Sequence, residues 1–317
     1  MQPRLTRRRA FAVLAGLGAM AKGAGAAAAP VFEWRGTALG ADATLLFANA
    51  DRSRAEQAMT SIVAEIDRLE SIFSLHLADS EISRLNRDAI LRDPSLDMRA
   101  LLDRCHTLHR ATEGLFDPTV QIIWEYRRGE AERGNDRGGP VPARVLSKVG
   151  YHRLVVGPDR IEIPLGAAIT LNGIAQGYIT DRIADLLRHR GWSDVLIDLG
   201  ETLALEGRSF DVEIRDSGRR IPLRNAALAT SSAAQMPAGQ TAILPHIFHP
   251  GTGTAAARSG STVTVRHPSA TVADALSTAL TLTDPGDATM ARRILARFPQ
   301  AKTWIARPQT GDVITED

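Results

Sequence analysis

The chain is poor in cysteine, in long apolar runs and in net charge, and each shortage removes a class of protein. Cys105 is the single cysteine in 317 residues, so we expect no internal disulfide and no N-terminal cysteine to carry a lipid. Beyond the N-terminal region, no stretch approaches the ~18 apolar residues of a membrane helix. Hydrophobic residues make up 44% of the chain, which indicates one large or two closely packed globular units.

The first residues have the pattern of an export signal. A basic cluster at 7–9 precedes an apolar stretch at 10–21 and small residues at 26–29. Phe11 follows the arginines at the spacing of a twin-arginine signal, although an ordinary secretory signal with a chance arginine run is an alternative. We therefore assign residues 1–29 to a twin-arginine-type signal peptide.

The slight basic character of the chain belongs to this signal. The formal net charge is +2, and residues 1–28 contain five cationic residues and no acidic one, so the remainder carries −3. This charge gives no reason to expect nucleic-acid binding. We expect residues 30–317 to form a freely soluble periplasmic domain without a membrane span.

Helix and strand patterns follow one another in no regular order. Amphipathic helices are predicted at 54–73, 98–112, 176–190, 271–282 and 286–298, and strands at 40–47, 152–157, 159–164, 168–171, 194–200, 210–215, 261–267 and 302–306. Since βαβ alternation is absent, we predict an α+β fold with mixed, mainly antiparallel sheets and packed helices. Residues 127–142 are predicted to be an exposed, flexible loop, and the Ala/Ser/Pro-rich region 226–260 to interrupt the strands.

A turn rich in small residues opens the helix predicted at 176–190. Gly173, Ala175 and Gly177 let another group approach the backbone, and the free N–H groups of a helix start can bind an anion. Neither a dinucleotide-binding glycine fingerprint nor a phosphate-binding P-loop is present. The alternative is a closely packed turn between a strand and a helix.

A carboxylate and a hydroxyl share one face of the helix predicted at 271–282. Asp274 and Thr278 are four residues apart, and both are hard oxygen donors of the kind that Mg²⁺ takes. Alternatively, Thr278 bonds its own helix and Asp274 interacts with the helix dipole.

Two histidines lie three residues apart before a glycine-rich turn. His246 and His249 could be zinc ligands, but no cysteine or further histidine cluster completes a set. Either residue could instead accept a proton near neutral pH or have an ordinary structural role.

Eight segments, in chain order, resemble the successive motifs of the ApbE family of FAD:protein FMN transferases. They are GTALGADATL, FSLHLADSEISRLN, GLFDPTV, LNGIAQGYITDRIADLL, LIDLG, ATSS, HIFHPGTG and VTVRHPSATVADALSTAL. The resemblance covers nearly the whole mature chain, from about residue 36 to 282, and the order of the motifs makes it specific.

The resemblance implies a Mg²⁺-dependent transfer of FMN from FAD to a threonine or serine hydroxyl of another exported redox protein, with release of AMP. It implies that Mg²⁺ is held by the carbonyl of Ala175 and the side chains of Asp274 and Thr278. It places His246 beside the acceptor hydroxyl, which is a poor nucleophile unaided. The implied flavin and adenine contacts are Thr37, Ser74, Asp117, Thr119, Gly177, Asp181 and Thr230.

The sequence also departs from the family pattern, mostly on the side of the acceptor. Gln176 stands in place of a lysine, Glu201 stands where a Gly-Gly-Asp run is common, and residues 232–234 replace a Gly-Asp-aromatic run. His249 and Gly251 replace an Asp and an Arg. An exported protein that binds or hydrolyses FAD without transfer is therefore the alternative function.

Overall fold

The computed structural model describes residues 31–135, 139–233, 236–238, 242–256, 262–284, 287–306 and 313–316, with backbone alone for 236–238, 242–243 and 313–316. The predicted signal peptide lies outside these residues, as does the centre of the predicted 127–142 loop, at 136–138. No helix of the described part combines the length and the apolar character needed to cross a membrane.

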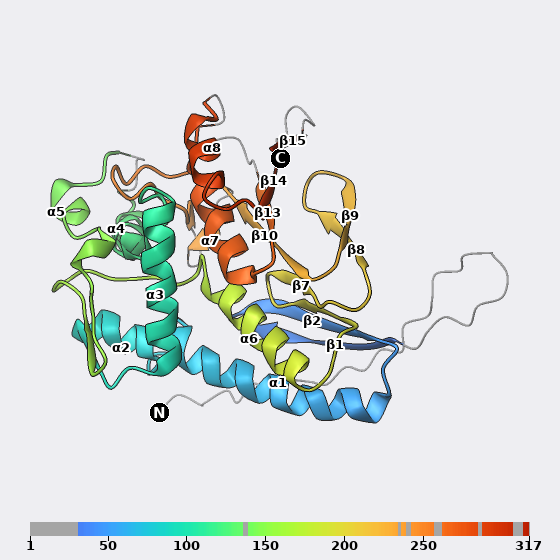
Figure 1. The fold of residues 1–317 in the computed structure, drawn as a ribbon. Coiled ribbons are helices and arrows are strands. Elements are labelled where there is room, and N and C mark those ends of the chain that lie inside the picture. Colours follow the sequence, from blue (N-terminus) through green and yellow to red (C-terminus); the bar gives the residue numbers. More distant parts are fainter. Residues whose placement is uncertain are drawn as a thin grey trace.

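One antiparallel sheet of eight strands forms the backbone of the fold, in the order β1-β2-β6-β7-β10-β13-β14-β15 (Figure 1). Its strands are β1 (Val31–Ala38), β2 (Ala41–Ala48), β6 (Val195–Asp198), β7 (Thr202–Ala204), β10 (Ala226–Ser232), β13 (Thr262–His267), β14 (Lys302–Ala306) and β15 (Val313–Glu316). The smaller sheets are formed by β3 (Ile90–Arg92), β4 (Val155–Val156) and β5 (Arg160–Glu162); by β8 (Phe210–Ile214) and β9 (Arg219–Leu223); and by β11 (Met236–Ala238) and β12 (Ala242–Leu244).

Helices stack in layers against the central strands. The helix α7 (Ala270–Leu280) packs on β10 and β13, α6 (Ala175–His189) packs on α7, and α1 (Arg52–Phe73) packs on α6. The remaining helices are α2 (Glu81–Asp88), α3 (Leu96–Ala111), α4 (Gln121–Glu132), α5 (Ala143–Leu146) and α8 (Thr289–Leu295), with short 3₁₀ turns at Pro118–Val120 and Tyr151–Arg153. The predicted α+β class is confirmed.

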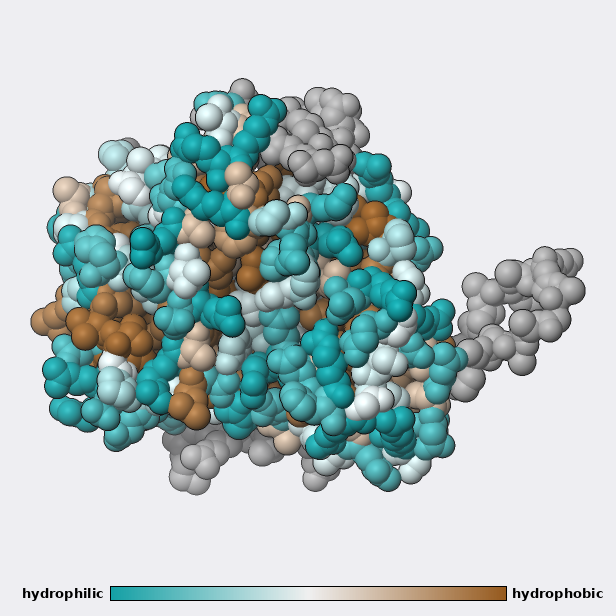
Figure 2. All heavy atoms as spheres, in the orientation of Figure 1, coloured by the Kyte–Doolittle hydropathy of each residue, from teal (hydrophilic) through white to brown (hydrophobic). Residues whose placement is uncertain are grey.

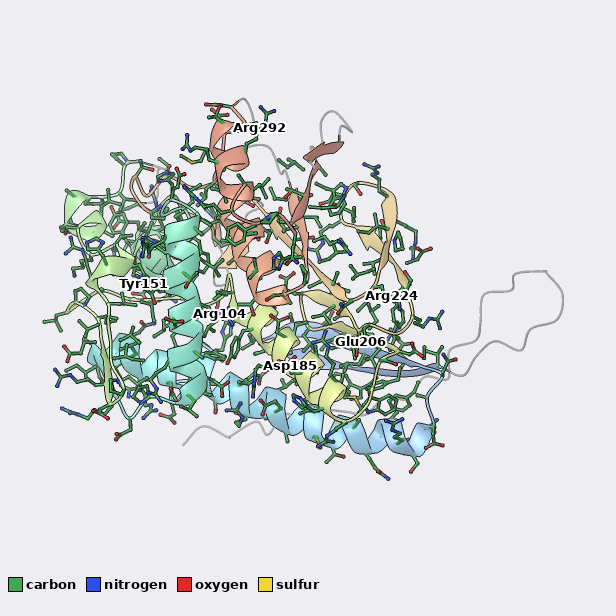
Figure 3. All side chains as sticks on the ribbon, viewed as in Figure 1. Arg104, Tyr151, Asp185, Glu206, Arg224 and Arg292 are labelled. Carbon is green, nitrogen blue, oxygen red and sulfur yellow. The ribbon has the colours of Figure 1, made fainter. Side chains whose placement is uncertain are left out.

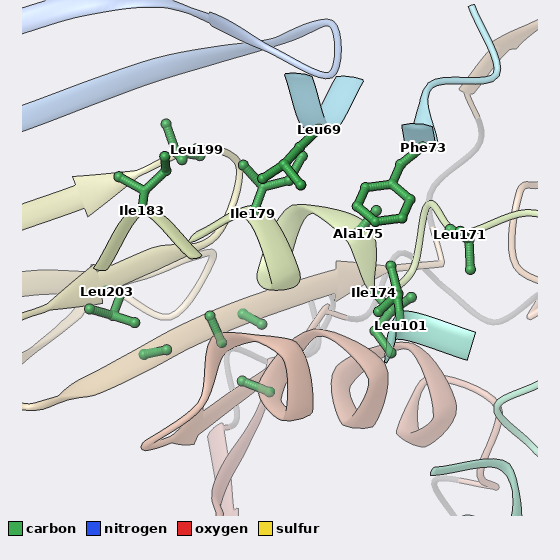
Figure 4. Packing of buried hydrophobic residues seen from close by; sticks show 14 of the residues in the cluster. Leu69, Phe73, Leu101, Leu171, Ile174, Ala175, Ile179, Ile183, Leu199 and Leu203 are labelled. Carbon is green, nitrogen blue, oxygen red and sulfur yellow. The ribbon is translucent and has the colours of Figure 1, made fainter. Parts of the chain in front are cut away.

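The apolar stripe of α1 explains why this long helix forms and what it covers. Asp51 caps the helix, since its Oδ1 accepts the N–H of Arg54 at 2.9 Å. Figure 4 shows Leu69 of α1 beside Ile179 of α6, and both side chains are at most 1% exposed. Each such fully buried side chain contributes about 1.5–3 kcal/mol to folding.

Residues 168–171 are not the strand that the sequence predicts. The side-chain amide of Asn86 replaces a neighbouring strand: its Nδ2 donates to the carbonyl of Ile169 and its Oδ1 accepts the N–H of Ile169, both at 2.8 Å. The N–H of Thr170 donates to the carbonyl of Pro118 at 2.8 Å. A partner from a remote helix and one from a 3₁₀ turn thus take the backbone groups that a sheet would pair.

Two further sequence expectations are wrong in part. The predicted loop 127–142 begins inside α4, which continues to Glu132 and carries an Arg128–Glu132 pair at i,i+4, 3.7 Å apart. The predicted interruption at 226–260 contains β10, whose first residues are buried small side chains. These lack the alternation of a half-exposed strand because β10 lies between β7 and β13 and beneath α7.

Candidate functional site

The first turn of α6 touches α7 through backbone. The N–H of Gly177 donates to Oδ2 of Asp274 at 3.0 Å. A Cβ at position 177 would lie 2.4 Å from the carbonyl oxygen of Ala270 and 2.9 Å from Cβ of Asp274. Glycine is therefore required here because any side chain would force the two helices apart. We call this contact between the start of α6, residues 173–178, and α7 the α6–α7 seam.

The second glycine of the turn touches the other predicted metal ligand. A Cβ at Gly173 would lie 2.9 Å from Oγ1 of Thr278. Ala175 stands between the two glycines, and a main-chain carbonyl keeps a second lone pair even where it accepts a helical hydrogen bond. The structure therefore brings the turn that contains Ala175 onto the helical turn that spans Asp274 and Thr278.

Two serines that the sequence analysis did not single out complete this polar seam. Ser231 Oγ lies 2.8 Å from Oγ of Ser277 and 3.2 Å from Oγ1 of Thr278. Ser277 also donates to the carbonyl of Asp274 at 2.9 Å. Ser231 belongs to the ATSS motif, so its position in the motif could have marked it, whereas Ser277 shows only as a small polar residue within an apolar helix.

Burial raises the pKa values of the carboxylates near the seam. Desolvation raises the pKa of Asp274 to about 7; the Gly177 N–H opposes the shift and the charge of Asp181 adds to it. Glu201, in the turn between β6 and β7, is 6% exposed. Its pKa lies well above the usual range because of burial and then because of Asp274.

This chemistry fits a hard divalent cation. A fully buried carboxylate with a single main-chain donor lies beside hydroxyl oxygens, and such oxygen donors are what Mg²⁺ prefers. Across the described ranges, no three His, Cys, Asp or Glu side chains are grouped as a metal site. Hydroxyl and main-chain oxygens would have to complete the shell, and the predicted set of Ala175, Asp274 and Thr278 would supply such oxygens.

Asp181, one turn further along α6, holds the start of α7. Its carboxylate accepts from Ser269 Oγ at 2.7 Å, from the N–H of Ala270 at 2.8 Å, and from the N–H and Oγ1 of Thr271 at 3.0 and 2.6 Å. These bonds fix α7 against α6 and so position Asp274. The contact to a flavin nucleotide implied for Asp181 stays a prediction.

Asp117 and Thr119 form a second polar centre. Oδ1 of Asp117 accepts from the N–H and Oγ1 of Thr119 at 2.9 and 2.6 Å, and Oδ2 accepts the N–H of Tyr151 at 3.1 Å. The N–H of Gly150 donates to Oγ1 of Thr119 at 2.7 Å. Figure 3 shows Tyr151 beside α3. The Thr170–Pro118 bond joins this centre to the segment that leads into the seam.

The other implied flavin contacts lie on the strands and on the end of α1. Glu70 links two of them: its Oε1 accepts the N–H of Leu39, two residues beyond Thr37, and its carbonyl accepts the N–H of Ser74 at 3.0 Å. Thr230, on β10, has its Oγ1 2.8 Å from Oγ1 of Thr264 on β13. Across the sheet order, β1 and β10 are four strands apart, or about 19 Å, so Thr37 and Thr230 do not touch.

His246 and His249 lie in the irregular segment 244–256, and their surroundings differ. His249 is tied into its own turn, since its Nδ1 accepts the N–H of Gly251 at 3.1 Å and its carbonyl accepts the N–H of Gly253 at 2.8 Å. His246 is half-buried between Leu244 and Ile247, both of which are buried. The segment is held against α4 and α5 by an apolar cluster that includes Phe248.

The geometry therefore defines a class: α+β proteins with a buried, oxygen-rich contact between two helices. The model of the ApbE family matches residues 39–298, and the chain belongs to this family. It is similar to the protein named FAD:protein FMN transferase of Haemophilus influenzae, with 24% identity over 71% of this chain and 72% of that protein. It is also similar to the protein of the same name of Treponema pallidum, with 25% identity over 70% of each.

Solved structures share the fold. The Pseudomonas stutzeri flavinyl transferase ApbE, in its apo form, superimposes with a TM-score of 0.74 at 21% identity, covering 91% of this chain and 94% of that one. The ApbE protein of Thermotoga maritima gives a TM-score of 0.75 at 22% identity, covering 91% and 97%. At these identities the likeness establishes the architecture.

Proposed function

We propose that this protein is a transferase that moves FMN from FAD to a hydroxyl group of another protein. Two relatives that match most of the chain are named FAD:protein FMN transferase. The single observation that carries the proposal is the seam, where Gly177 and Gly173 press the start of α6 against Asp274 and Thr278. It puts the positive end of a helix dipole and hard oxygen donors in one place, which suits a pyrophosphate with a divalent cation.

The cation proposed here is Mg²⁺, held by the carbonyl of Ala175 and the side chains of Asp274 and Thr278. When bound, it would neutralise charge on the pyrophosphate oxygens and on the departing AMP. The protein would supply the positioning: Asp181 fixes α7 through four hydrogen bonds, and the positive end of the α6 dipole would attract the phosphates. Thr37, Ser74, Asp117, Thr119, Gly177, Asp181 and Thr230 are proposed as flavin and adenine contacts.

The proposed reaction exchanges one P–O bond for another. The hydroxyl oxygen of a Thr or Ser on the acceptor attacks the phosphorus of the FMN half of FAD. The bond from that phosphorus to the bridging oxygen breaks, and AMP leaves with the electron pair. His246 orients the hydroxyl and takes its proton.

The proposed location is the periplasm, because the first 29 residues have the pattern of a twin-arginine signal. The acceptor is then an exported redox protein that carries the Thr or Ser to be flavinylated. The alternative, binding or hydrolysis of FAD without transfer, is favoured by the departures from the family pattern at 232–234, His249 and Gly251.

Incubating residues 30–317 with FAD, Mg²⁺ and a candidate acceptor tests the proposal. The expected result is flavin fluorescence in the acceptor band of a denaturing gel, with one AMP released per label. Replacing the acceptor threonine by valine, or chelating the metal, should abolish the label. FAD bound without label, or AMP released together with free FMN, would instead establish the alternative.

A further inference from the structure

A groove lies between α2 and the outer edge of the small sheet β3-β5-β4. Its volume is about 390 Å³, and it is lined by Arg84 and Asp88 of α2 and by Ile90, Leu91 and Arg92 of β3. We call it the β3 groove. None of its residues belongs to the proposed FAD or Mg²⁺ site.

The edge of β3 that faces away from β5 offers unused backbone groups. Ala89 and Asp93 hydrogen-bond to the β5 side, through Ile163 N–H to Ala89 and Asp93 N–H to Asp159. In an antiparallel pair such bonding alternates along the strand, so the N–H and C=O groups of Ile90 and Arg92 point away from β5. Because β3 is an edge strand and the described residues show no other backbone partner for Ile90 or Arg92, these groups can pair with an added strand.

The positive charges of the groove favour an acidic binding partner. Asp88 is paired with Arg87 by two contacts at 3.1 and 3.2 Å. Within the described part of the chain, Arg84 and Arg92 have no carboxylate partner, and Nε of Arg84 is buried without any hydrogen-bond partner. Guanidinium groups without a carboxylate partner favour a carboxylate or a similar anion, which they can bind through two N–H groups.

Apolar side chains extend the groove on the outer face of the sheet. Ile90 and Val155 both pair with Glu162, so all three point to the same face, and the two apolar side chains are 40% and 56% exposed. Leu165, just beyond β5, is 88% exposed. Figure 2 shows hydrophobic residues gathered at the left of the molecule, where Figure 1 draws the yellow-green part of the chain near residue 160. Such a patch next to polar groups is typical of a binding surface.

The helix beside the groove also holds the segment that leads to the seam. Asn86, two residues after Arg84, hydrogen-bonds the backbone of Ile169, and Ala175 follows Ile169 by six positions. Six residues span at most about 20 Å, and α2 itself is about 10 Å across. A protein of ordinary size can therefore occupy the groove while it presents a hydroxyl to the seam.

We propose that the β3 groove docks an extended segment of the acceptor protein that carries acidic and apolar side chains. The segment lies along the edge of β3, its carboxylates meet Arg84 and Arg92, and its apolar side chains cover Ile90 and Val155. This inference rests on the proposed transfer function, for which it supplies the site of partner recognition.

Charge reversal tests the docking separately from the chemistry. In the variant Arg84→Glu/Arg92→Glu we expect KM for the acceptor protein to rise about 10–100-fold, with unchanged affinity for FAD and little change in kcat. The matched control is Arg104→Glu/Arg110→Glu, two exposed arginines of α3, which should leave KM within about twofold. Arg92→Glu alone, at an exposed position, should give part of the effect if the double variant folds poorly.

A crosslink gives an independent measurement. Because Cys105 is fully buried, Ile90→Cys provides a single accessible thiol for a photoreactive label. We expect light to join this position to the acceptor and not to join the exposed control Thr107→Cys. An unchanged KM in Arg92→Glu, or equal crosslinking at both positions, overturns the docking proposal. Wild-type protein that binds FAD but labels no acceptor overturns the transfer function instead.

Discussion

The α6–α7 seam and the segment 244–256 are the two regions on which the proposed reaction depends, and they are built in opposite ways. At the seam, backbone meets backbone across two helices, and Gly177 leaves no room for even a methyl group. The segment that carries His246 is irregular, and turns and an apolar cluster hold it in place. The comparison teaches that the proposed metal and pyrophosphate side is set by packing, whereas the acceptor side has room to vary.

The largest effect is expected where packing is tightest. In Gly177→Ala the new methyl group would overlap the carbonyl of Ala270, 2.4 Å away, so α6 and α7 must separate. We expect a loss of about 3 kcal/mol in the free energy of unfolding, measured by urea denaturation, together with lost Mg²⁺ binding. Gly139→Ala is the control, since a Cβ there meets nothing within 4 Å. Equal stability of the two variants would contradict the close contact.

Removing the charge of the seam while keeping its shape should abolish metal binding and spare the fold. Asp274→Asn retains an oxygen for the Gly177 N–H but lacks the anionic ligand, so Mg²⁺ affinity should fall about 100-fold. Isothermal titration in the presence of FAD measures this affinity. Thr278→Val, which removes a neutral donor, should weaken binding less, and an unaltered affinity in Asp274→Asn would rule out its role.

The pH dependence of stability tests the burial of Asp274 at the seam. The pKa of Asp274 is raised from 3.8 to about 7 in the folded protein, so between these values the folded state holds a proton that the unfolded chain releases. The free energy of unfolding of the metal-free protein should therefore decrease as pH rises from 4 to 7, by at most about 4 kcal/mol. Thermal unfolding in EDTA should show this slope in the wild type and a smaller one in Asp274→Asn. Parallel profiles would show that Asp274 titrates normally.

The smallest effect on the fold is expected on the acceptor side. His246→Ala removes a half-buried ring from an irregular segment, so the free energy of unfolding should change by no more than about 1 kcal/mol. Transfer should slow by about 10²–10⁴-fold with FAD affinity nearly intact, as measured by single-turnover labelling and flavin fluorescence. A loss of FAD affinity would instead make His246 a binding residue.

Much of the fold is predictable because its signals are local. The apolar stripe of α1 and the glycines that open α6 show in any window of the sequence, and so do the alternating residues of β13. The course of residues 168–171 is not predictable, since Asn86, more than 80 positions away, takes the place of a neighbouring strand. The strand β10 is not predictable for a related reason: its small residues show no alternation, and their burial depends on α7.

In the candidate site, too, local features are predictable from the sequence and long-range contacts are not. Asp274 and Thr278 share a helix face by spacing alone, but only the folded chain brings Gly173 and Gly177 against them. The role of Asp181 in holding α7 rests on contacts across almost 90 positions, which no local pattern contains. Ser277 was missed because a single serine within an apolar helix carries no signal until the fold brings it to Ser231.

The central claim is that one divalent cation is held between the carbonyl of Ala175 and the side chains of Asp274 and Thr278. Crystals of the protein soaked with FAD and Mn²⁺ test it most directly, by the position of the anomalous difference peak. We predict a single strong peak in contact with all three residues and with the pyrophosphate. A peak at His246 and His249, or bound FAD with no peak at the seam, would contradict the account.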